Sequence, residues 1–487
     1  MSKSEADPAG QAGSAAGFVR SVLIVAGGTA AAQLIAVAAS PILSRVYSPK
    51  DYGVFGVYTS LVAIAAVASS LSYHQAIPLP EREHDAGCIV KLALRLVLAA
   101  AMGVGVTMWL AGGGLVETLG MPDLRRYLWL MPFGVLAAGT FEILTQWTIR
   151  RRRFSDITRA AVCQSVGQSG TQVAAGLIAA SPLGLLAGQV VGQATSVAML
   201  ISRLTAEDRQ YLKTRTHGEI AEAARRYRSF ALYGTPASLM NAVGANAPSL
   251  VLSALFGGAV TGMFILASRV LLMPVTLLSK SSAQVFLSRA ATALRAGTLP
   301  DETRALFERL SALAVPYGIL GGAAAPAAFA LAFWRPWREA GVYAQWLCPW
   351  LVLVFISGAL SPLVAVYERQ AANMTFQTSL FVGRLGALAL GGVVGEARWA
   401  IGLYAIASAG MWLAFTVWLL RLSGNRVAFG VSHLGWQAAV GTLAAAPTIL
   451  ARLSVASDVT VTVTAAISGA AMTAWLYRKK VMIWTAV

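Results

Sequence analysis

Residues 342–366 read VYAQWLCPWLVLVFISGALSPLVAV and contain no charged side chain. A bilayer core about 30 Å thick is crossed by a helix of about 20 apolar residues, so this stretch is long enough to span a membrane. Comparable apolar stretches recur along all 487 residues of the chain. The sequence therefore predicts an all-α polytopic membrane protein.

The composition agrees with this prediction and argues against a soluble enzyme. Apolar residues make up 57% of the chain and charged residues 12%, whereas soluble proteins carry about 25% charge. The net charge of +17 would favour nucleic acid as partner only for a soluble domain. Here the basic residues lie between apolar stretches, as in cytoplasmic loops, and no basic run is interleaved with aromatic residues. We therefore expect no nucleic-acid partner.

We predict about fourteen spans with both chain ends in the cytoplasm, and twelve is the alternative because Thr, Ser and Gly dilute the last two. The spans lie near residues 21–43, 53–77, 87–111, 127–149, 157–180, 182–202, 229–255, 260–285, 308–333, 342–366, 372–394, 399–420, 433–451 and 459–477. Lys and Arg gather in the segments that this arrangement places inside, such as 150–153 and 203–228. This distribution follows the positive-inside rule and indicates a protein of the inner (cytoplasmic) membrane.

An internal repeat divides the spans into two lobes. An offset of 209 positions aligns Tyr52-Gly53-Val54-Phe55 with Thr261-Gly262-Met263-Phe264 without a gap. The repeat predicts two six-helix lobes in parallel orientation, an arrangement of transporters that hold their substrate between the lobes. The predicted parts are a disordered cytoplasmic tail (1–18), an N-lobe of six spans (19–202), a cytoplasmic amphipathic loop (203–228), a C-lobe of six spans (229–421), and two further spans with a short cytoplasmic C-terminus (422–487).

Two arginines fall near the middle of predicted spans. Arg269 lies in span eight and Arg384 in span eleven, and Lys280 shares a helix face with Arg269. A charge at the bilayer centre costs about 2.5–3.5 kcal/mol, so each cation needs a partner or an aqueous cavity. An anionic ligand in a cleft between the lobes is the economical partner.

Protein carboxylates are too few to neutralise these cations. Glu142 is the one clearly intramembrane acid in the sequence, and it fits either a salt bridge or a protonatable coupling group. The remaining candidate cations are Arg45, Arg95 and Arg159. Arg45 and Arg159 lie at span ends, where snorkelling to the interface also explains them.

Amide side chains recur at helical spacing in the predicted N-lobe. Gln164, Gln168 and Gln172 follow one another at i, i+4 and i+8. The other residues assigned to a hydrated, glycan-binding lining are Gln33, Gln189, Gln193, Asn241 and Tyr73. Hydrogen bonds between neighbouring helices explain the amides equally well.

Two further patterns favour structural roles. Glycines at 184, 188 and 192 predict close helix packing. Tryptophans at 334, 337, 346 and 350 predict an aromatic belt at the membrane interface.

Motifs of the common catalytic sites are missing from the sequence. No glycine precedes any lysine, so there is no Walker A motif, and neither H-E-x-x-H nor G-x-S-x-G occurs. The three cysteines are too widely spaced for a metal site or a disulfide framework. We therefore expect no catalytic residues, no bound metal and no cofactor.

Two segments resemble one bacterial family. Residues 43–55 read LSRVYSPKDYGVF and resemble the "lsPxdYGxf" turn after the first span of bacterial polysaccharide flippases. Residues 72–80 read SYHQAIPLP and resemble the "RYexAIvLP" segment that ends their second span. Ser72 stands where arginine is frequent and Gln75 also departs from the pattern, which leaves open whether this segment supplies a cation. With its fourteen spans, the chain resembles the Wzx-type O-antigen and exopolysaccharide flippases of the multidrug/oligosaccharidyl-lipid/polysaccharide exporter superfamily.

The resemblance implies a substrate and a mechanism. The expected substrate is an undecaprenyl-pyrophosphate-linked oligosaccharide, moved by alternating access from the cytoplasmic to the outer leaflet during O-antigen, exopolysaccharide or capsule synthesis. It implies that the six basic side chains named above hold the pyrophosphate and that the amides face the glycan. It also implies that the lipid tail stays in the bilayer or in a groove beside the last two helices. Membrane lipids and polysaccharide-assembly proteins are the expected partners, and coupling to protons or sodium stays open.

Three alternatives remain. A lipid II flippase of the same superfamily is poorly separated by sequence from an O-antigen flippase. A drug or metabolite:cation antiporter would favour buried carboxylates, whereas this membrane interior is cationic. A membrane-embedded glycan enzyme would need an outer catalytic loop, and none of the predicted loops is large enough.

Overall fold

The computed structural model describes residues 8–213, 217–454 and 456–478, and every regular element in these residues is a helix. The chain divides into two compact units, residues 1–47 with 54–247 and residues 48–53 with 248–487. Up to residue 234 the elements are α1 (Pro8–Val46), α2 (Pro49–Ser69), η1 (Tyr73–Ala76), α3 (Glu83–Thr118), η2 (Pro122–Leu130), α4 (Met131–Arg150), α5 (Phe154–Ile178), α6 (Pro182–Ser202), α7 (Ala206–Lys213), α8 (His217–Arg226) and the π-helical turn η3 (Phe230–Gly234). They are followed by α9 (Thr235–Ala296), α10 (Leu299–Phe333), η4 (Arg335–Trp337), α11 (Arg338–Leu360), α12 (Pro362–Val366), α13 (Gln370–Val394), α14 (Ala397–Leu422), α15 (Val427–Leu453) and α16 (Asp458–Arg478).

The number of membrane-crossing helices agrees with the predicted fourteen. In the described residues, 12 helical segments are long and apolar enough to cross a membrane. One of them is α9, whose 62 residues are broken into two helices at Gly257, where φ is 77°. The helix α5 has 25 residues but is not among the twelve, because glutamine, serine and threonine dilute it. Counting α9 as two helices and adding α5 gives fourteen, and the chain is a multi-pass membrane protein.

Glycines let the helices of the first unit approach closely. The helix α5 packs against both α1 and α6. A Cβ atom on Gly188 of α6 would lie 2.4 Å from Cγ of Gln172, and one on Gly192 would lie 2.7 Å from Cβ of Gln168. The predicted packing role of this glycine stripe is therefore confirmed, and α5 presents its row of glutamines to it.

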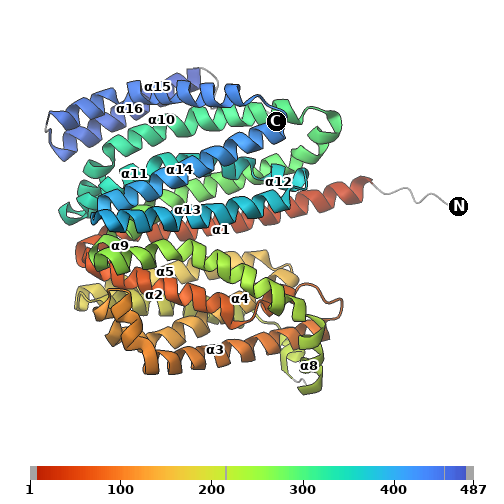
Figure 1. Ribbon diagram of the computed structural model, residues 1–487. Helices are drawn as coiled ribbons and strands as arrows, with labels where there is room; N and C mark the ends of the chain where they lie inside the picture. The colour runs from red at the N-terminus through yellow and green to blue at the C-terminus, as the bar shows by residue number, and fades with distance from the viewer. Residues whose placement is uncertain (1–7, 214–216, 455, 479–487) are drawn as a thin grey trace. The chain divides into compact units, whose positions relative to one another are not determined.

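The second unit is built around α10 and α14. The helix α10 lies against α11, α15 and α16, while α14 lies against α11 and α13 (Figure 1). Large aromatic side chains fill the space at one end of these helices, and Phe307 and Phe415 are both buried there. Phe415 stacks on Phe376 of α13 with 4.1 Å between ring centroids. These contacts fix α13 and α14 relative to each other.

A reciprocal glycine contact joins the first turn of α2 to the second half of α9 inside the second unit. A Cβ on Gly53 would lie 2.0 Å from the carbonyl oxygen of Gly258, and one on Gly262 would lie 1.9 Å from the carbonyl oxygen of Pro49. The predicted 209-residue offset relates Gly53 to Gly262 and also Pro49 to Gly258. The two segments thus make the same contact with each other, as a pseudo-twofold relation requires.

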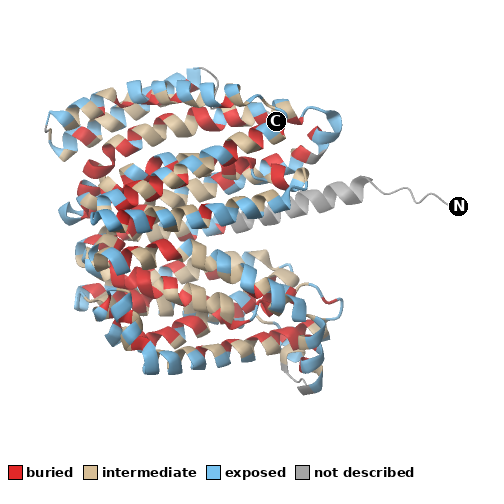
Figure 2. Cartoon of the chain, viewed as in Figure 1, coloured by how far each residue is buried: buried red, intermediate tan, exposed pale blue. Residues whose placement is uncertain are grey.

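Large apolar side chains face outward on the membrane helices. Trp109 on α3 is 84% exposed and Leu443 on α15 is 78% exposed. Figure 2 shows exposed residues along the length of α3. Apolar surface of this extent is expected where lipid replaces water as the surroundings.

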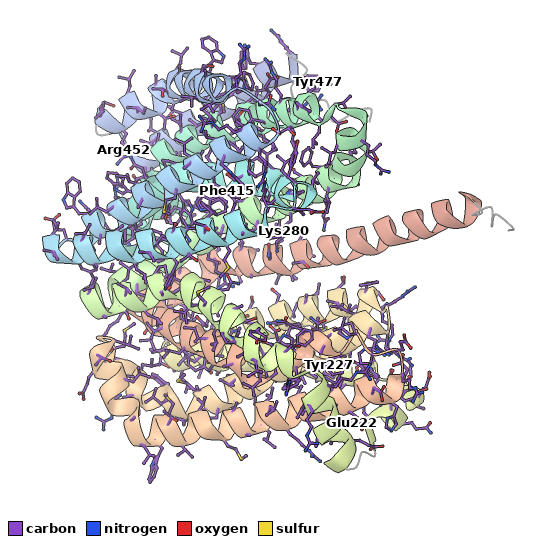
Figure 3. All side chains as sticks on the ribbon, turned by 45° about the vertical axis from the view of Figure 1, so that its right-hand side comes forward. Glu222, Tyr227, Lys280, Phe415, Arg452 and Tyr477 are labelled. Carbon is purple, nitrogen blue, oxygen red and sulfur yellow. The ribbon has the colours of Figure 1, made fainter. Side chains whose placement is uncertain are left out.

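The segment after α6 forms two short helices, α7 and α8, and both pack against α3. On α8 the apolar residues Ile220 and Ala223 are buried, and α8 packs on α3. The opposite side carries Glu222, which is exposed, and Tyr227 follows the last turn (Figure 3). The apolar face predicted for this loop therefore contacts the protein itself.

The N-terminal segment differs from its predicted disorder. The helix α1 begins at Pro8, within the predicted tail of residues 1–18. Alanine, the strongest helix former, recurs in this segment. Residues 1–7 and the predicted C-terminal segment 479–487 lie outside the described residues.

Candidate functional site

Arg384 on α13 is held by neutral partners. Its Nε donates a hydrogen bond to Oγ of Ser408 on α14, 3.0 Å away. The guanidinium carbon lies 4.8 Å from the ring centroid of Trp350 on α11 and 5.5 Å from that of Tyr404 on α14. Aromatic faces attract a cation through their quadrupole. No carboxylate of the described residues lies within 4 Å of Arg384, so its charge is not neutralised by the protein.

The aromatic residues around Arg384 form a connected group. Trp350 meets Tyr404 edge-on at 5.6 Å, and Phe264 of α9 meets Tyr404 edge-on at 5.9 Å. Trp350 is only 6% exposed, so the prediction that it belongs to an interfacial belt is wrong. Sequence spacing could not reveal this role, because the partners come from three helices far apart in the chain.

Arg269 lies on the second half of α9 and is half-buried. Tyr52 is the ionisable side chain that interacts with it. The Gly53–Gly262 crossing explains this proximity, because it brings the first turn of α2 against the helix that carries Arg269. Tyr52 is itself packed edge-on against the buried ring of Trp337 at 4.9 Å. Among the described residues Arg269 has no ion-pair partner.

The other predicted cations lie in exposed positions. Lys280 is exposed on α9, about 16 Å along the helix from Arg269 at 1.5 Å per residue (Figure 3). Arg45 ends α1 and Arg95 lies on α3, and both are exposed. Arg159 pairs with Asp156 one turn earlier on α5, at 3.3 Å. The structure does not gather these four around Arg269 and Arg384 within one unit.

The amide residues divide into bonded and unbonded groups. Gln172 is 1% exposed, and its amide donates to the carbonyl of Leu185 on α6 at 3.1 Å. The side-chain oxygens of Gln33 on α1 and Gln193 on α6 are buried without a hydrogen-bond partner among the described residues. Gln164, Gln168 and Gln189 are half-buried, and Asn241 is exposed. Gln172 thus serves helix packing, whereas Gln33 and Gln193 keep unused acceptors.

Two predicted residues of the first unit take other roles. Tyr73 is buried and its hydroxyl donates to the carbonyl of Ala224 on α8 at 3.0 Å, so it does not line an open cavity. Glu142 on α4 lies 3.4 Å from Nε2 of His74 and is 54% exposed. Its partner is therefore a histidine of η1.

Arg150, the last residue of α4, holds the neighbouring loop in place through hydrogen bonds. Arg150 donates to the carbonyls of Ile77, Pro78 and Pro80, and its Nε lies 3.1 Å from Glu83. The prolines of residues 72–80 leave carbonyls without amide donors, and this arginine satisfies them. From its sequence the basic cluster of residues 150–153 was interpreted only as a sign of the cytoplasmic side, and this hydrogen-bonding role of Arg150 was missed.

A second network holds α7. Its buried carboxylate, Asp208, lies 2.8 Å from Arg151 and 2.5 Å from Arg153, and it accepts a hydrogen bond from the amide of Thr205 at 2.9 Å. Burial alone would raise the pKa of Asp208. The hydrogen bonds from Thr205 and Arg153 outweigh burial and hold this pKa below its ordinary value.

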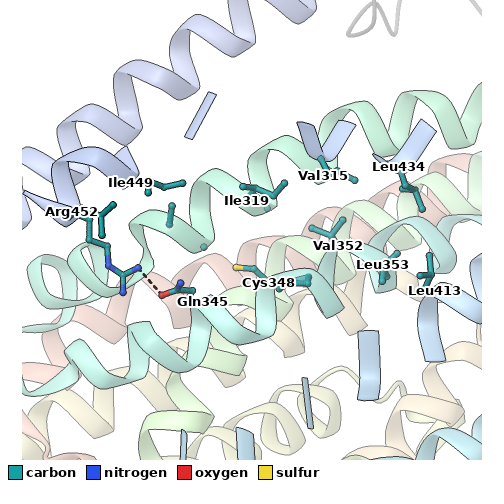
Figure 4. Close-up of a pocket in the computed structure, with 16 residues that line it drawn as sticks. Val315, Ile319, Gln345, Cys348, Val352, Leu353, Leu413, Leu434, Ile449 and Arg452 are labelled. Carbon is teal, nitrogen blue, oxygen red and sulfur yellow. Dashed lines mark hydrogen bonds between the residues drawn. The ribbon is translucent and has the colours of Figure 1, made fainter. Parts of the chain in front are cut away.

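The second unit contains an elongated apolar cavity beside α15, one of the last two helices, for which the sequence resemblance implied only a groove without naming its residues. It has a volume of about 800 Å³. It is lined by α10, α11, α14 and α15, with Val315, Val352, Leu413 and Leu434 among its walls. Arg452 donates to the side-chain oxygen of Gln345 at 2.9 Å at one end, and Leu413 and Leu434 lie at the other (Figure 4). The signal that could have found it is the run of small residues Gly318, Gly322 and Ala323 on α10.

Comparisons with known proteins agree with this fold. The family profile described as "Polysaccharide biosynthesis protein" matches residues 42–341. A solved structure titled "Lipid II flippase MurJ, inward closed conformation" superposes with a TM-score of 0.71 at 10% identity, covering 94% of this chain and 100% of that one. An inward-facing multidrug resistance MATE family transporter of the MOP superfamily gives a TM-score of 0.58 at 15% identity, with 80% and 95% covered. No curated protein sequence matches.

Proposed function

The chain belongs to the family of polysaccharide biosynthesis proteins, and from this premise we propose that it is a flippase for a polyprenyl-pyrophosphate-linked oligosaccharide. It carries this lipid from the cytoplasmic to the outer leaflet of the bacterial inner membrane, by alternating access. The fold, shared with solved flippase and transporter structures, supports a transporter.

The observation that carries the proposal is the pair Arg269 and Arg384. Both lie on membrane helices, and no described carboxylate lies within 4 Å of either. A permanent positive charge in a membrane without a counter-charge is costly unless a ligand or water supplies one. A guanidinium presents donors that match phosphate oxygens in pairs. A pyrophosphate is therefore the ligand chemistry that these residues suit.

The apolar cavity is an argument for a substrate with a long lipid tail. Its lining on α15 extends from Leu434 to Arg452, about 27 Å of helix. This length is close to the thickness of the hydrocarbon core, about 30 Å. A polyprenyl chain needs an apolar path of this kind, while its head group passes elsewhere. The unsatisfied side-chain oxygens of Gln33 and Gln193 are suited to accept hydrogen bonds from sugar hydroxyls.

The neighbouring candidate is a lipid II flippase. The structure named for that function has the higher TM-score of the two neighbours described above. At 10% identity this likeness shows the fold alone. Offering both lipids to the same protein and comparing their rates of movement therefore distinguishes the two candidate functions.

The test is transbilayer movement in proteoliposomes. A fluorescent polyprenyl-pyrophosphate oligosaccharide and fluorescent lipid II are compared, using wild type, Arg269→Ala and Arg384→Ala. We expect wild type to move the oligosaccharide and both variants to be at least about tenfold slower, the equivalent of about 1.4 kcal/mol. The matched control is Arg304→Ala, because Arg304 also stacks on an aromatic ring, Phe429 at 4.1 Å, but lies at an exposed position.

Each outcome has a meaning. If wild type moves only lipid II, the second candidate replaces the first. If both arginine variants match wild type while Arg304→Ala does too, the pyrophosphate assignment to Arg269 and Arg384 is wrong.

A further inference from the structure

Three side chains of the first unit form a row, joined by one hydrogen bond and one ion-pair contact, that the proposed transport site does not use. Oγ of Ser70 lies 2.6 Å from Nδ1 of His74, and Nε2 of His74 lies 3.4 Å from a carboxylate oxygen of Glu142. The side chain of His74 is 9% exposed, whereas that of Glu142 is 54% exposed. The imidazole is therefore enclosed by protein, and the Glu142 carboxylate beside it is partly accessible to the surroundings.

This row has two distinct states that differ by one proton. With a neutral imidazole protonated at Nε2, this N–H faces the Glu142 carboxylate 3.4 Å away, and Nδ1 accepts from the Ser70 hydroxyl. With an imidazolium, Nδ1 carries a proton too, so the Ser70 hydroxyl must turn its own proton away. One added proton thus reverses the hydrogen bond to Ser70 and turns the contact with Glu142 into an ion pair.

His74 lies in η1, between the membrane-crossing segments Pro49–Ser69 and Glu83–Thr118. Burial lowers the pKa of His74, and the carboxylate of Glu142 opposes this shift. The two influences act in opposite directions on a group whose ordinary pKa is about 6.5.

Other charged groups near η1 are already engaged or lie further along their helices. Besides Glu142, the titratable side chains on η1 and on the elements packed against it are Tyr73 on η1, Glu83, His84, Asp85, Cys88, Lys91, Arg95 and Glu117 on α3, Arg150 on α4, Tyr233 on η3, and Glu219, Glu222, Arg225 and Arg226 on α8. Arg150 is bound to Glu83 and to loop carbonyls. His84 is bound to Asp85 and Glu219. Glu142 is therefore the carboxylate that faces the His74 ring.

The segment that carries His74 is strained and contacts the start of α9. Leu71 and Ser72, just before η1, have φ values of 47° and 56°, a region that costs energy for residues other than glycine. The hydroxyl of Thr235 donates to Ser72 at 3.3 Å, and the amide of Gln75 donates to Ser238 at 3.4 Å. Directly before Thr235 lies the π-helical turn η3 (Phe230–Gly234), a form that often marks functional positions.

We propose that Ser70, His74 and Glu142 form a proton-binding site whose occupancy controls the packing of η3 and the first turn of α9. A change of hydrogen bonding at His74 shifts the strained residues Leu71 and Ser72. Ser72 and Gln75 bond to the first turn of α9, so the shift reaches that helix. The proton-binding site itself does not depend on the proposed function. Its role in coupling proton binding to transport does rest on that function.

The first experiment needs no substrate. Hydrogen exchange of residues 230–238 is measured on the full chain in nanodiscs from about pH 5 to pH 8, with protection corrected for the intrinsic rate. We expect the wild-type protection to change with a single midpoint, and we expect His74→Gln and Glu142→Gln to lose this change. The matched control, His433→Gln, keeps it, because His433 lies on α15 beside Gln437. A midpoint that persists in His74→Gln, or that disappears in His84→Gln instead, overturns the proposal.

The second experiment separates this proposal from the flippase assignment. Movement of the fluorescent oligosaccharide is followed with and without a pH gradient. We expect the gradient to accelerate wild type and to have no effect on His74→Gln. If wild type moves no oligosaccharide but shows the exchange midpoint, the substrate is wrong and the proton site stands. If wild type transports without any exchange midpoint, the proton site is wrong and the flippase stands.

Discussion

Arg384 illustrates how a charge can be kept in a membrane helix with neutral contacts. One hydrogen bond to Ser408 and two aromatic faces orient the guanidinium, and none of them cancels its charge. A carboxylate partner would hold the side chain more strongly but would also compete with an anionic ligand. The neutral environment therefore fixes the position of the arginine, and under the proposed function its charge is what the pyrophosphate binds.

The first prediction replaces this arginine by lysine. Arg384→Lys keeps the charge but loses the planar group that donates to Ser408 and stacks on Trp350. We expect a lower Tm and a loss of about 1–2 kcal/mol of stabilisation, since a buried cation–π contact and a hydrogen bond each contribute about 1 kcal/mol. Thermal unfolding in detergent measures the change. Arg304→Lys, at an exposed stack on Phe429, should change Tm less, and an equal change would contradict the prediction.

At the scale of helices, alanine substitutions should lower Tm at the Gly53–Gly262 contact and raise it at an open glycine. Gly53→Ala and Gly262→Ala should each lower Tm, because the new Cβ would meet a carbonyl oxygen at 2.0 Å and 1.9 Å respectively. The double variant should lose less than the sum, because the first substitution already separates the helices. Gly103→Ala on α3 is the control, since no atom lies within 4 Å of its new Cβ. It should gain about 0.5–1 kcal/mol from helix propensity.

The docking of α7 gives a prediction with a pH dependence. Asp208→Asn leaves Arg151 and Arg153 without their buried carboxylate, and we expect a loss of about 3 kcal/mol in the local stability of α7. In wild type the folded pKa of Asp208 is depressed. Its contribution is therefore present above the unfolded pKa of about 3.9 and is lost as pH falls through the lower folded value.

Hydrogen exchange of residues 206–213 against pH checks this prediction. Wild type should lose protection only in acid, whereas Asp208→Asn should be unprotected at neutral pH as well. Equal protection of α7 in both proteins at pH 7 would show that Asp208 does not hold it. Glu207→Gln is a suitable comparison, because Glu207 is 60% exposed and its ion pair among the described residues is with Arg151.

Across the whole molecule, the sequence predicted the helices well because a span is a local property of about 20 residues. The prediction even included α5, which hydropathy alone underrates. It also identified the repeat whose glycines make the reciprocal contact. What a residue does inside the fold depended on partners from other helices. Trp350 beside Arg384, and His74 beside Glu142, are pairs that no spacing along the chain indicates.

The residues that line the apolar cavity were likewise beyond the reach of the sequence, which implied only a groove beside the last two helices. Ala438→Phe places a ring into a space of about 800 Å³ lined by α10, α11, α14 and α15. If the polyprenyl tail lies there, the ring displaces it, and oligosaccharide movement should fall about tenfold, the equivalent of about 1.4 kcal/mol of tail binding. Leu443→Phe changes the same helix on its lipid-facing side, where the residue is 78% exposed, and should leave transport unchanged. Shortening the polyprenyl chain of the substrate should reduce the difference between wild type and Ala438→Phe. If the difference is the same for short and long chains, the ring disturbs the helices and not the tail, and the cavity has no part in binding the lipid.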